Sequence, residues 1–360
     1  MRKEVYRMGD NEARALVAAA NVIHLASVKP DGTPLLRTLN AVVVDGAVCF
    51  HGAPAGEKVE ALGRPTVVSA ERVIASIPSY FLDPERACPA TTLYLSAEAH
   101  GTLEEVTDAR IKARVIDALM AKYQPEGGHV PIAVDHPLYA KPIRGLLVAQ
   151  VRLDRIDGKA KVAQNRTPEE RSRLCEKLWQ RGGPGDADAV ETILALNPDT
   201  PLPSFLQGPE NTRLVASVPP TEADRAAQLL DGAYWNGDIS RAELAAAHRG
   251  SQAWVGARDT NGTLVATTRA LSDAAKHAWI YDVMVAPEWR NRGLGFAVVK
   301  LALEHPAVRT ARKVHLGTRD AHGLYRKFGF IDESEMPPRG YTSSTMHLTR
   351  PVHSLGITPR

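Results

Sequence analysis

A short segment in the last third of the chain has the composition of an anion-binding loop. Residues 290–295 read Arg-Asn-Arg-Gly-Leu-Gly, between an apolar strand-like stretch, 278–285, and a helix-like stretch, 296–303. The first N–H groups of a helix lack intrahelical partners, and the helix dipole is positive at that end. The two glycines let a ligand approach the backbone, and the two arginines add charge. These residues predict a diphosphate site, although a solvated turn before a helix explains them equally well when they stand alone.

A second motif lies downstream of the loop. Residues 321–330 read Ala-His-Gly-Leu-Tyr-Arg-Lys-Phe-Gly-Phe and follow a strand-like stretch, 313–318. An Arg-x-x-Gly-x-Gly loop, then a short helix with a tyrosine, then Phe-Gly-Phe, resembles the GNAT acetyltransferase superfamily. The resemblance extends over essentially the whole C-terminal domain, about 214–350.

The GNAT resemblance implies direct transfer of an acetyl group from acetyl-CoA to a small-molecule amine in a ternary complex, without a covalent enzyme intermediate. The strand before the loop would pair with the pantetheine arm, and the loop amides would hold the pyrophosphate. The cofactor-binding residues implied in this way are Val283, Met284, Val285, Arg290, Asn291, Arg292, Gly293, Leu294, Gly295, Thr318 and Gly323.

Two catalytic residues are expected, Tyr325 from the resemblance and Asp282 from its position on the strand before the loop. Tyr325 would donate a proton to the departing thiolate, because a phenol and a thiol have similar pKa ranges; it could instead be a packed helix tyrosine. Asp282 is a candidate base for the attacking amine, since strand alternation would place it on one face with Ile280 and Met284. It could also belong to a structural network, with Tyr281, Glu288, His322 or an ordered water carrying the proton.

The first part of the chain has the pattern of antiparallel hairpins. Strand-like runs at 22–28, 35–44 and 47–51 are joined by turns that contain Asp-Gly, which tolerates positive φ. A short helix is expected at 54–62, and an amphipathic helix at 108–123. Further strands are expected at 93–103 and 145–153.

A strand-to-helix turn, 50–58, is the candidate phosphate site of this region. With the strand 36–40 before it and the stretch 87–96 after it, it resembles the FMN-binding split-barrel superfamily, which includes pyridoxamine-phosphate-oxidase-like proteins. The resemblance implies a homodimer with FMN at the interface, although haem, deazaflavin or no cofactor are also compatible with this fold. The flavin-site residues implied are Arg37, Thr38, Asn40, His51, Gly52, Lys58 and Ser96.

Residues 155–166 sharpen this likeness. They end in Lys-Val-Ala-Gln-Asn-Arg and are similar to the Glu-Gly-Lys-x-Lys-x-Ser-Gln-Asn segment of split-barrel proteins classed as FMN-binding transcriptional regulators. Ala163 stands where that segment has serine, so a hydroxyl group is lost.

Length and composition fit this organisation. A chain of 360 residues favours two domains, and 44% hydrophobic with 24% charged residues is typical of globular proteins. We expect an α+β two-domain fold: an N-terminal antiparallel split β-barrel with flanking helices and a C-terminal GNAT mixed α/β sheet. The expected boundaries are 1–180 for the barrel, 181–210 for a Gly- and Pro-rich linker, 211–350 for the GNAT domain and 351–360 for a tail.

The sequence also excludes several classes. The net charge of +3 and the lack of a helix with clustered Arg and Lys disfavour nucleic-acid binding. Cys49, Cys88 and Cys175 are far apart, which argues against a zinc or other metal site and against disulfides, and no apolar run is long enough for a signal peptide or a membrane span. The expected location is the cytoplasm.

Two functional hypotheses follow. The first is a bifunctional enzyme, in which an N-acetyltransferase is fused to a flavin-binding barrel that performs a redox step on a related nitrogenous molecule. The second is an acetyltransferase whose barrel is a non-catalytic module for dimerisation or ligand sensing. Variable segments, 234–248 and 336–341, would shape the amine pocket, and residue types alone do not identify the amine.

Overall fold

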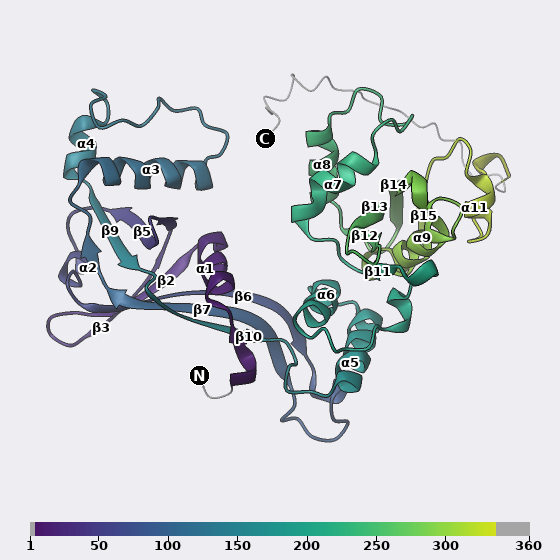
Figure 1. Ribbon diagram of the computed structural model, residues 1–360, viewed down its shortest axis with the longest axis horizontal. Coiled ribbons are helices and arrows are strands. Elements are labelled where there is room, and N and C mark those ends of the chain that lie inside the picture. Colours follow the sequence, from purple (N-terminus) through teal and green to yellow (C-terminus); the bar gives the residue numbers. More distant parts are fainter. Residues whose placement is uncertain (1–3, 336–360) are drawn as a thin grey trace. The chain divides into compact units, whose positions relative to one another are not determined.

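The computed structural model describes residues 4–335 (Figure 1). The chain divides into two compact units, and the boundary between them in the sequence lies between Asn165 and Arg166. The first unit contains antiparallel sheets, and the second contains one mixed sheet. The predicted α+β two-domain fold class is confirmed. The predicted tail, 351–360, and the predicted pocket segment 336–341 lie outside the described residues.

The first unit is built on a six-stranded sheet, in the order β1-β10-β7-β6-β2-β3, and a four-stranded sheet, in the order β4-β5-β9-β8. Its strands are β1 Arg7–Met8, β2 Ile23–Val28, β3 Pro34–Leu39, β4 Val42–Val44, β5 Ala47–Gly52, β6 Pro65–Ile77, β7 Thr91–Thr102, β8 Glu104–Glu105, β9 Leu147–Arg152 and β10 Arg155–Lys161. Its helices are α1 Asp10–Ala19, α2 Glu57–Glu60, α3 Ala109–Tyr123 and α4 Ala140–Gly145.

The predicted single strand 35–44 is instead two strands in different sheets. β3 pairs with β2, whereas β4 pairs with β5. The chain turns at Ala41, whose backbone groups are bonded to side chains of α3: the Ala41 N–H donates to the Tyr123 hydroxyl at 3.1 Å, and Lys122 Nζ donates to the Ala41 carbonyl at 2.9 Å. Because α3 satisfies these groups, the strand can break here without leaving unpaired polar atoms.

The second unit has a five-stranded sheet in the order β11-β12-β13-β14-β15, antiparallel except for the β14–β15 pair. Its strands are β11 Arg213–Val215, β12 Ala253–Arg258, β13 Leu264–Ser272, β14 His277–Val285 and β15 Lys313–His315. Its helices are α5 Pro168–Arg181, α6 Asp186–Leu196, α7 Ala223–Leu229, α8 Arg241–Arg249, α9 Leu294–Glu304, α10 Pro306–Arg309 and α11 His322–Arg326.

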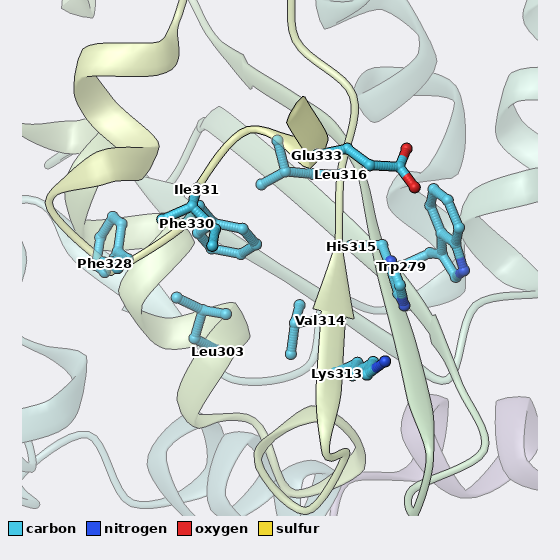
Figure 2. A pocket seen from close by; sticks show the side chains of 11 residues that line it. Trp279, Leu303, Lys313, Val314, His315, Leu316, Phe328, Phe330, Ile331 and Glu333 are labelled. Atoms are coloured by element: carbon cyan, nitrogen blue, oxygen red, sulfur yellow. The ribbon is translucent and has the colours of Figure 1, made fainter. Parts of the chain in front are cut away.

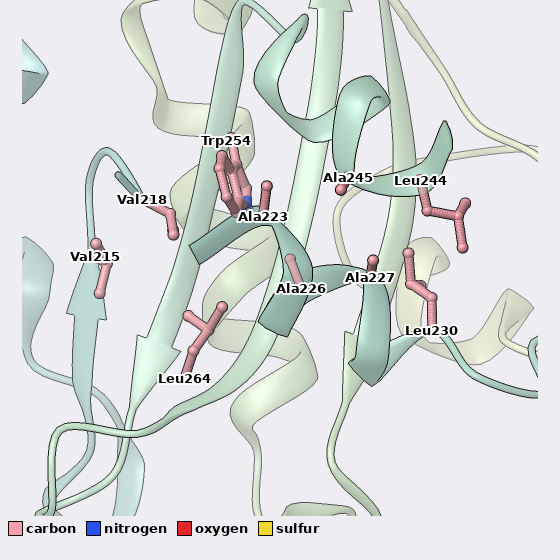
Figure 3. Packing of buried hydrophobic residues seen from close by; sticks show 10 residues of the cluster. All are labelled: Val215, Val218, Ala223, Ala226, Ala227, Leu230, Leu244, Ala245, Trp254 and Leu264. Atoms are coloured by element: carbon pink, nitrogen blue, oxygen red, sulfur yellow. The ribbon is translucent and has the colours of Figure 1, made fainter. Parts of the chain in front are cut away.

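Helices α7 and α8 cover one face of this sheet (Figure 3). Several of their buried residues are small: Ala223, Ala226, Ala227 and Ala245 lie in one core cluster with Trp254 of β12. Small side chains let both helices approach the sheet closely. This packing anchors the loop that follows α7, which contributes to the site described below.

Residues 181–210, predicted as a linker, contain helix α6 and belong to the second compact unit, as does α5. Two glycines of this Gly- and Pro-rich segment are helix caps: Gly182 ends α5 with φ 67°, and Gly185 precedes α6 with φ 79°. Asp186 is buried and paired with Arg181. Gly182 and Gly185 therefore mark the ends of helices within this segment.

Candidate acetyl-transfer site and flavin-site residues

The sheet of the second unit opens between β14 and β15. These strands pair only over His277–Trp279 with Lys313–His315, and beyond this point a cavity of about 660 Å³ lies between them. The cavity is lined by Tyr234, Trp235, Trp279, Ile280, Tyr281, Asp282, Val283, Leu316, Gly317, Thr318, Arg319, Asp320, Ala321 and Tyr325. The structure therefore brings the predicted residues Asp282, Val283, Thr318 and Tyr325 to one place.

A β-bulge at Asp282 shapes this opening. Asp282 has φ 53°, and the register with β13 shifts between Thr267 and Arg269. The bulge interrupts the strand alternation, so the predicted common face of Ile280 and Met284 is wrong. Ile280 packs in the cluster around Val308, whereas Met284 packs against the α7 and α8 cluster.

The Asp282 carboxylate is buried and fully engaged. Arg269 Nε donates to Oδ2 at 2.6 Å, and Trp235 Nε1 donates to Oδ1 at 3.1 Å. A non-glycine residue with positive φ is strained, and these two bonds hold it in that conformation. Its predicted role as a base stays a prediction, and accepting a proton would compete with the bond from Arg269.

The predicted diphosphate loop lies at the start of α9. Gly293 is the residue before the helix and has φ 82°, a conformation that favours glycine. Arg290 Nε donates to the Val285 carbonyl at 3.2 Å, which ties the loop to the end of β14. Arg292 pairs with Glu210 at 2.9 Å and lies over the ring of Trp289.

Four further predicted cofactor residues lie around the start of α9 and in α11. Asn291 precedes the helix with φ 62°, and Leu294 is buried as its first residue. A Cβ atom at Gly295 would make ordinary contacts with Val285 and Leu324, and one at Gly323 would meet open space. Only Gly293 is therefore required by its backbone conformation.

Tyr325 lies on α11 with its side chain buried and its ring edge-to-face with Phe330. Burial raises the pKa of Tyr325 to about 12, and the nearby Tyr234 and Asp320 act in the same direction. The phenol is thus neutral at physiological pH and carries the proton that it would donate. The raised pKa makes it a weaker acid than a free phenol, so its pKa lies further from that of a thiol than was expected from the sequence. Thr318, on the same wall, accepts a bond at Oγ1 from the Ala321 N–H at 3.0 Å.

Aromatic side chains form walls of the cavity. Two of them, Tyr234 and Trp235, belong to the segment 234–248 that was expected to shape the amine pocket, whereas Trp279 was not singled out from the sequence. Trp279 and Tyr281 project from β14, and Tyr234 and Trp235 lie in the loop after α7. Trp279 also lines an adjoining cavity of about 550 Å³, together with the β15 residues and 328–331 (Figure 2). The spacing of Trp279 and Tyr281 on alternate strand positions was the available signal, because both point to the same face.

The predicted flavin-site residues of the first unit fall into two groups. The Thr38 hydroxyl contacts His24 Nδ1 at 3.3 Å, and His24 Nε2 lies 3.2 Å from Glu71, which is paired in register with Ser96. Thr38 and Ser96 therefore share one face of the six-stranded sheet. Arg37 is the neighbour of Thr38 along β3 and projects from the opposite face.

The second group lies near α2. Arg37 and Lys29 both pair with Glu57, and a Cβ atom at Gly52 would lie 2.5 Å from Lys58 Nζ. Glycine at 52 thus leaves room for the Lys58 ammonium group at the end of β5. Arg37 and Lys29 are neutralised by the Glu57 carboxylate, whereas Lys58 lies beside Gly52 at the end of β5. His51 and Asn40 are exposed, at the ends of β5 and β3.

Within residues 4–335, no helix is long and apolar enough to cross a bilayer, and no group of three or more His, Cys, Asp or Glu side chains could hold a metal ion. The three cysteines are not in disulfides.

Comparison with known families agrees with this geometry. Residues 221–330 match the acetyltransferase (GNAT) family model, and residues 9–160 match the pyridoxamine 5'-phosphate oxidase family model. The C-terminal part is thus an acyltransferase domain. The chain joins a domain of the pyridoxamine 5'-phosphate oxidase family to a domain of the GNAT family.

Individual relatives are more distant. An uncharacterized N-acetyltransferase, ycf52, of Pyropia yezoensis is 31% identical over 84 residues, which is 22% of this chain and 45% of the relative. GCN5-related N-acetyltransferase 1, chloroplastic, of Arabidopsis thaliana is 31% identical over 99 residues, 27% of this chain and 50% of the relative. This chain thus spans about half the length of the curated relatives it matches. The FAD and heme binding protein of Mycobacterium smegmatis is 19% identical over 44% of this chain and 74% of its own, with a TM-score of 0.36.

Proposed function

We propose that the chain is an acetyl-CoA-dependent N-acetyltransferase that acts on a small amine by direct transfer. The observation that carries this proposal is one cavity lined by the open strand edge at Val283 and the buried neutral phenol of Tyr325. The strand that lines it, β14, leads into the glycine loop, where Gly293 caps the start of α9. The β14 backbone up to Val285 would pair with the pantetheine amides, and the N-terminus of α9 would bind the pyrophosphate.

In the proposed ternary complex, the amine nitrogen attacks the thioester carbonyl carbon. A C–N bond forms as the C–S bond breaks, and Tyr325 donates its proton to the thiolate of CoA. The amine proton leaves to solvent or to Asp282, whose carboxylate lines the same cavity.

We also propose that the first unit binds FMN and performs a redox step on a related nitrogenous molecule. Lys58 would hold the FMN phosphate, and the flavin would supply electron transfer. In the alternative proposal, the first unit is a non-catalytic module for dimerisation or ligand sensing. Both proposals include a homodimer formed through the first unit, which sedimentation would test.

The discriminating experiment is native mass spectrometry of the full chain for bound flavin and CoA, followed by an acetyl-CoA screen against small amines with wild type and Tyr325→Phe. Bound FMN that turns over a nitrogenous compound supports the bifunctional enzyme. Acetyl transfer by a chain whose bound flavin is redox-inert, or that holds no flavin, supports the alternative.

A further inference from the structure

The cavity between β14 and β15 presents four aromatic rings that the transfer step does not use. Tyr234, Trp235, Trp279 and Tyr281 keep 44%, 43%, 44% and 37% of their surface exposed, and all four line the same cavity. Large aromatic side chains exposed together on a concave surface mark a ligand-binding wall. This wall is continuous with the Tyr325 side of the cavity, where the acceptor nitrogen must lie.

Neighbouring groups hold these rings in place. Tyr234 and Trp235 pack edge-to-face at 4.9 Å between ring centroids, and the Arg319 guanidinium lies 3.6 Å from the Tyr234 centroid. The Arg319 backbone N–H also donates to the Tyr234 hydroxyl at 3.0 Å. The Trp279 ring stacks on His315 at 4.6 Å (Figure 2). The aromatic wall is therefore formed before a substrate enters, which lowers the entropic cost of binding a flat ring.

The charged groups of the cavity are paired with one another. Asp282 is bonded to Arg269, and Asp320 lies 3.3 Å from Arg319. A polycationic acceptor would need carboxylates that are not already paired with arginine. An acidic acceptor would need a cationic side chain that is not already paired with a carboxylate. The balance of charge and the aromatic surface favour an acceptor whose body is flat and uncharged.

We infer that the acceptor is an arylamine, an amino group attached directly to an aromatic ring; this inference rests on the proposed acetyltransferase function. Its ring would stack on Trp279 and Tyr281. An arylamine nitrogen is already neutral near pH 7, so it attacks the thioester without prior deprotonation, in keeping with the engaged carboxylate of Asp282. The C–N bond forms, the C–S bond breaks, Tyr325 protonates the thiolate, and the nitrogen's surplus proton returns to Tyr325 through solvent.

The test compares three amines of similar size with the full chain and acetyl-CoA: aniline, benzylamine and cyclohexylamine. We expect kcat/KM to fall in that order, with aniline at least about ten-fold above cyclohexylamine, because stacking and a neutral nitrogen both favour it. Equal or higher kcat/KM for cyclohexylamine would overturn the inference.

Variants of the aromatic wall separate recognition from folding. Trp279→Ala should lower kcat/KM for aniline about ten-fold and for cyclohexylamine less than about two-fold, and Trp279→Phe should restore most of the loss. Tyr80→Ala, which removes a ring 62% exposed in the first unit, should change neither value. An equal loss for both amines in Trp279→Ala would contradict the inference.

Calorimetric titration with acetyl-CoA distinguishes a failure of the arylamine inference from a failure of the acetyltransferase proposal. Acetyl-CoA binding and amine transfer without preference for arylamines would overturn the substrate class and leave the acetyltransferase proposal intact. A chain that does not bind acetyl-CoA would refute both.

Discussion

The two units differ in how their candidate sites are assembled. In the second unit, the edge of β14 and the short helix α11 line one cavity, and β14 leads directly into the glycine loop before α9. In the first unit, the candidate residues are divided between two faces of a sheet, as Arg37 and Thr38 show. A site at a loop–helix junction can be identified from consecutive residues, whereas a site on a sheet depends on register and on which chain covers each face.

The largest effect on the second unit's site is expected from a substitution in its glycine loop. We expect Gly293→Glu to weaken acetyl-CoA binding by at least about 100-fold, because a carboxylate would face the diphosphate and the backbone would be strained. Calorimetric titration measures this loss.

Gly262→Glu is the matched control, since Gly262 has the same φ of 82° in a turn with nothing within 4 Å. Both variants should lose about 1 kcal/mol of stability, and only Gly293→Glu should lose acetyl-CoA. Equal binding by the two variants would show that the loop does not hold the cofactor.

A second prediction concerns the proton donor. Tyr325→Phe should lower kcat about 100-fold and leave acetyl-CoA affinity within about two-fold, because the phenol acts on the leaving group. Since burial raises the pKa of Tyr325 to about 12, wild-type kcat should not decline between pH 8 and 10 through loss of this proton. Steady-state kinetics across pH measures both effects, with Tyr80→Phe as the control, and an unchanged kcat in Tyr325→Phe would remove the residue from the mechanism.

The third prediction concerns the stability of the second unit in acid, which depends on His305. Burial, reinforced by Arg309, lowers the pKa of His305 from 6.5 to about 4. Between these values the unfolded state binds more protons than the folded state, so the second unit is stabilised above pH 6.5 and loses stability as pH falls towards 4. From pH 6.5 to pH 5 the loss should be about 2 kcal/mol.

Urea unfolding monitored at several pH values tests this dependence. His305→Asn keeps an acceptor for the Ala307 N–H at the start of α10 but has no titrating group. Between pH 6.5 and pH 5, the free energy of unfolding of this variant should therefore fall by about 2 kcal/mol less than that of the wild type. The same pH dependence in wild type and variant would contradict the assignment to His305.

The smallest effect is expected in the first unit. Lys58→Ala should weaken flavin binding about ten-fold, because it removes the cation that would hold the phosphate. Retained absorbance near about 450 nm, after gel filtration at matched concentrations, measures this loss. Arg114→Ala, which removes an exposed arginine paired with Asp45, is the control. No loss of flavin in Lys58→Ala would place the phosphate elsewhere.

Local signals made much of the fold predictable. Asp108 caps α3 by accepting bonds from two backbone N–H groups, as its position before an amphipathic run suggests. The strands at 278–285 and 313–318 and the helix after the glycine loop were also expected, although α9 begins two residues before the expected 296–303. The pattern was sufficient in these places because a few consecutive residues determine the structure.

Other features depend on distant partners and could not be predicted. The break at Ala41 requires Lys122 and Tyr123, some 80 residues away in the chain. The bulge at Asp282 requires Arg269 and Trp235 to hold a non-glycine residue at positive φ. The aromatic wall likewise forms only when the loop after α7 meets β14, so residue types revealed its parts but not their assembly.

The most direct test of the central claim is the release of CoA thiol from acetyl-CoA by the full chain in the presence and absence of a panel of small amines. The structure predicts amine-dependent thiol release with formation of the N-acetyl product, and loss of both in Gly293→Glu. Thiol release that does not depend on any amine, or that persists unchanged in Gly293→Glu, would contradict the proposed site, which combines the β14–β15 cavity with the glycine loop before α9.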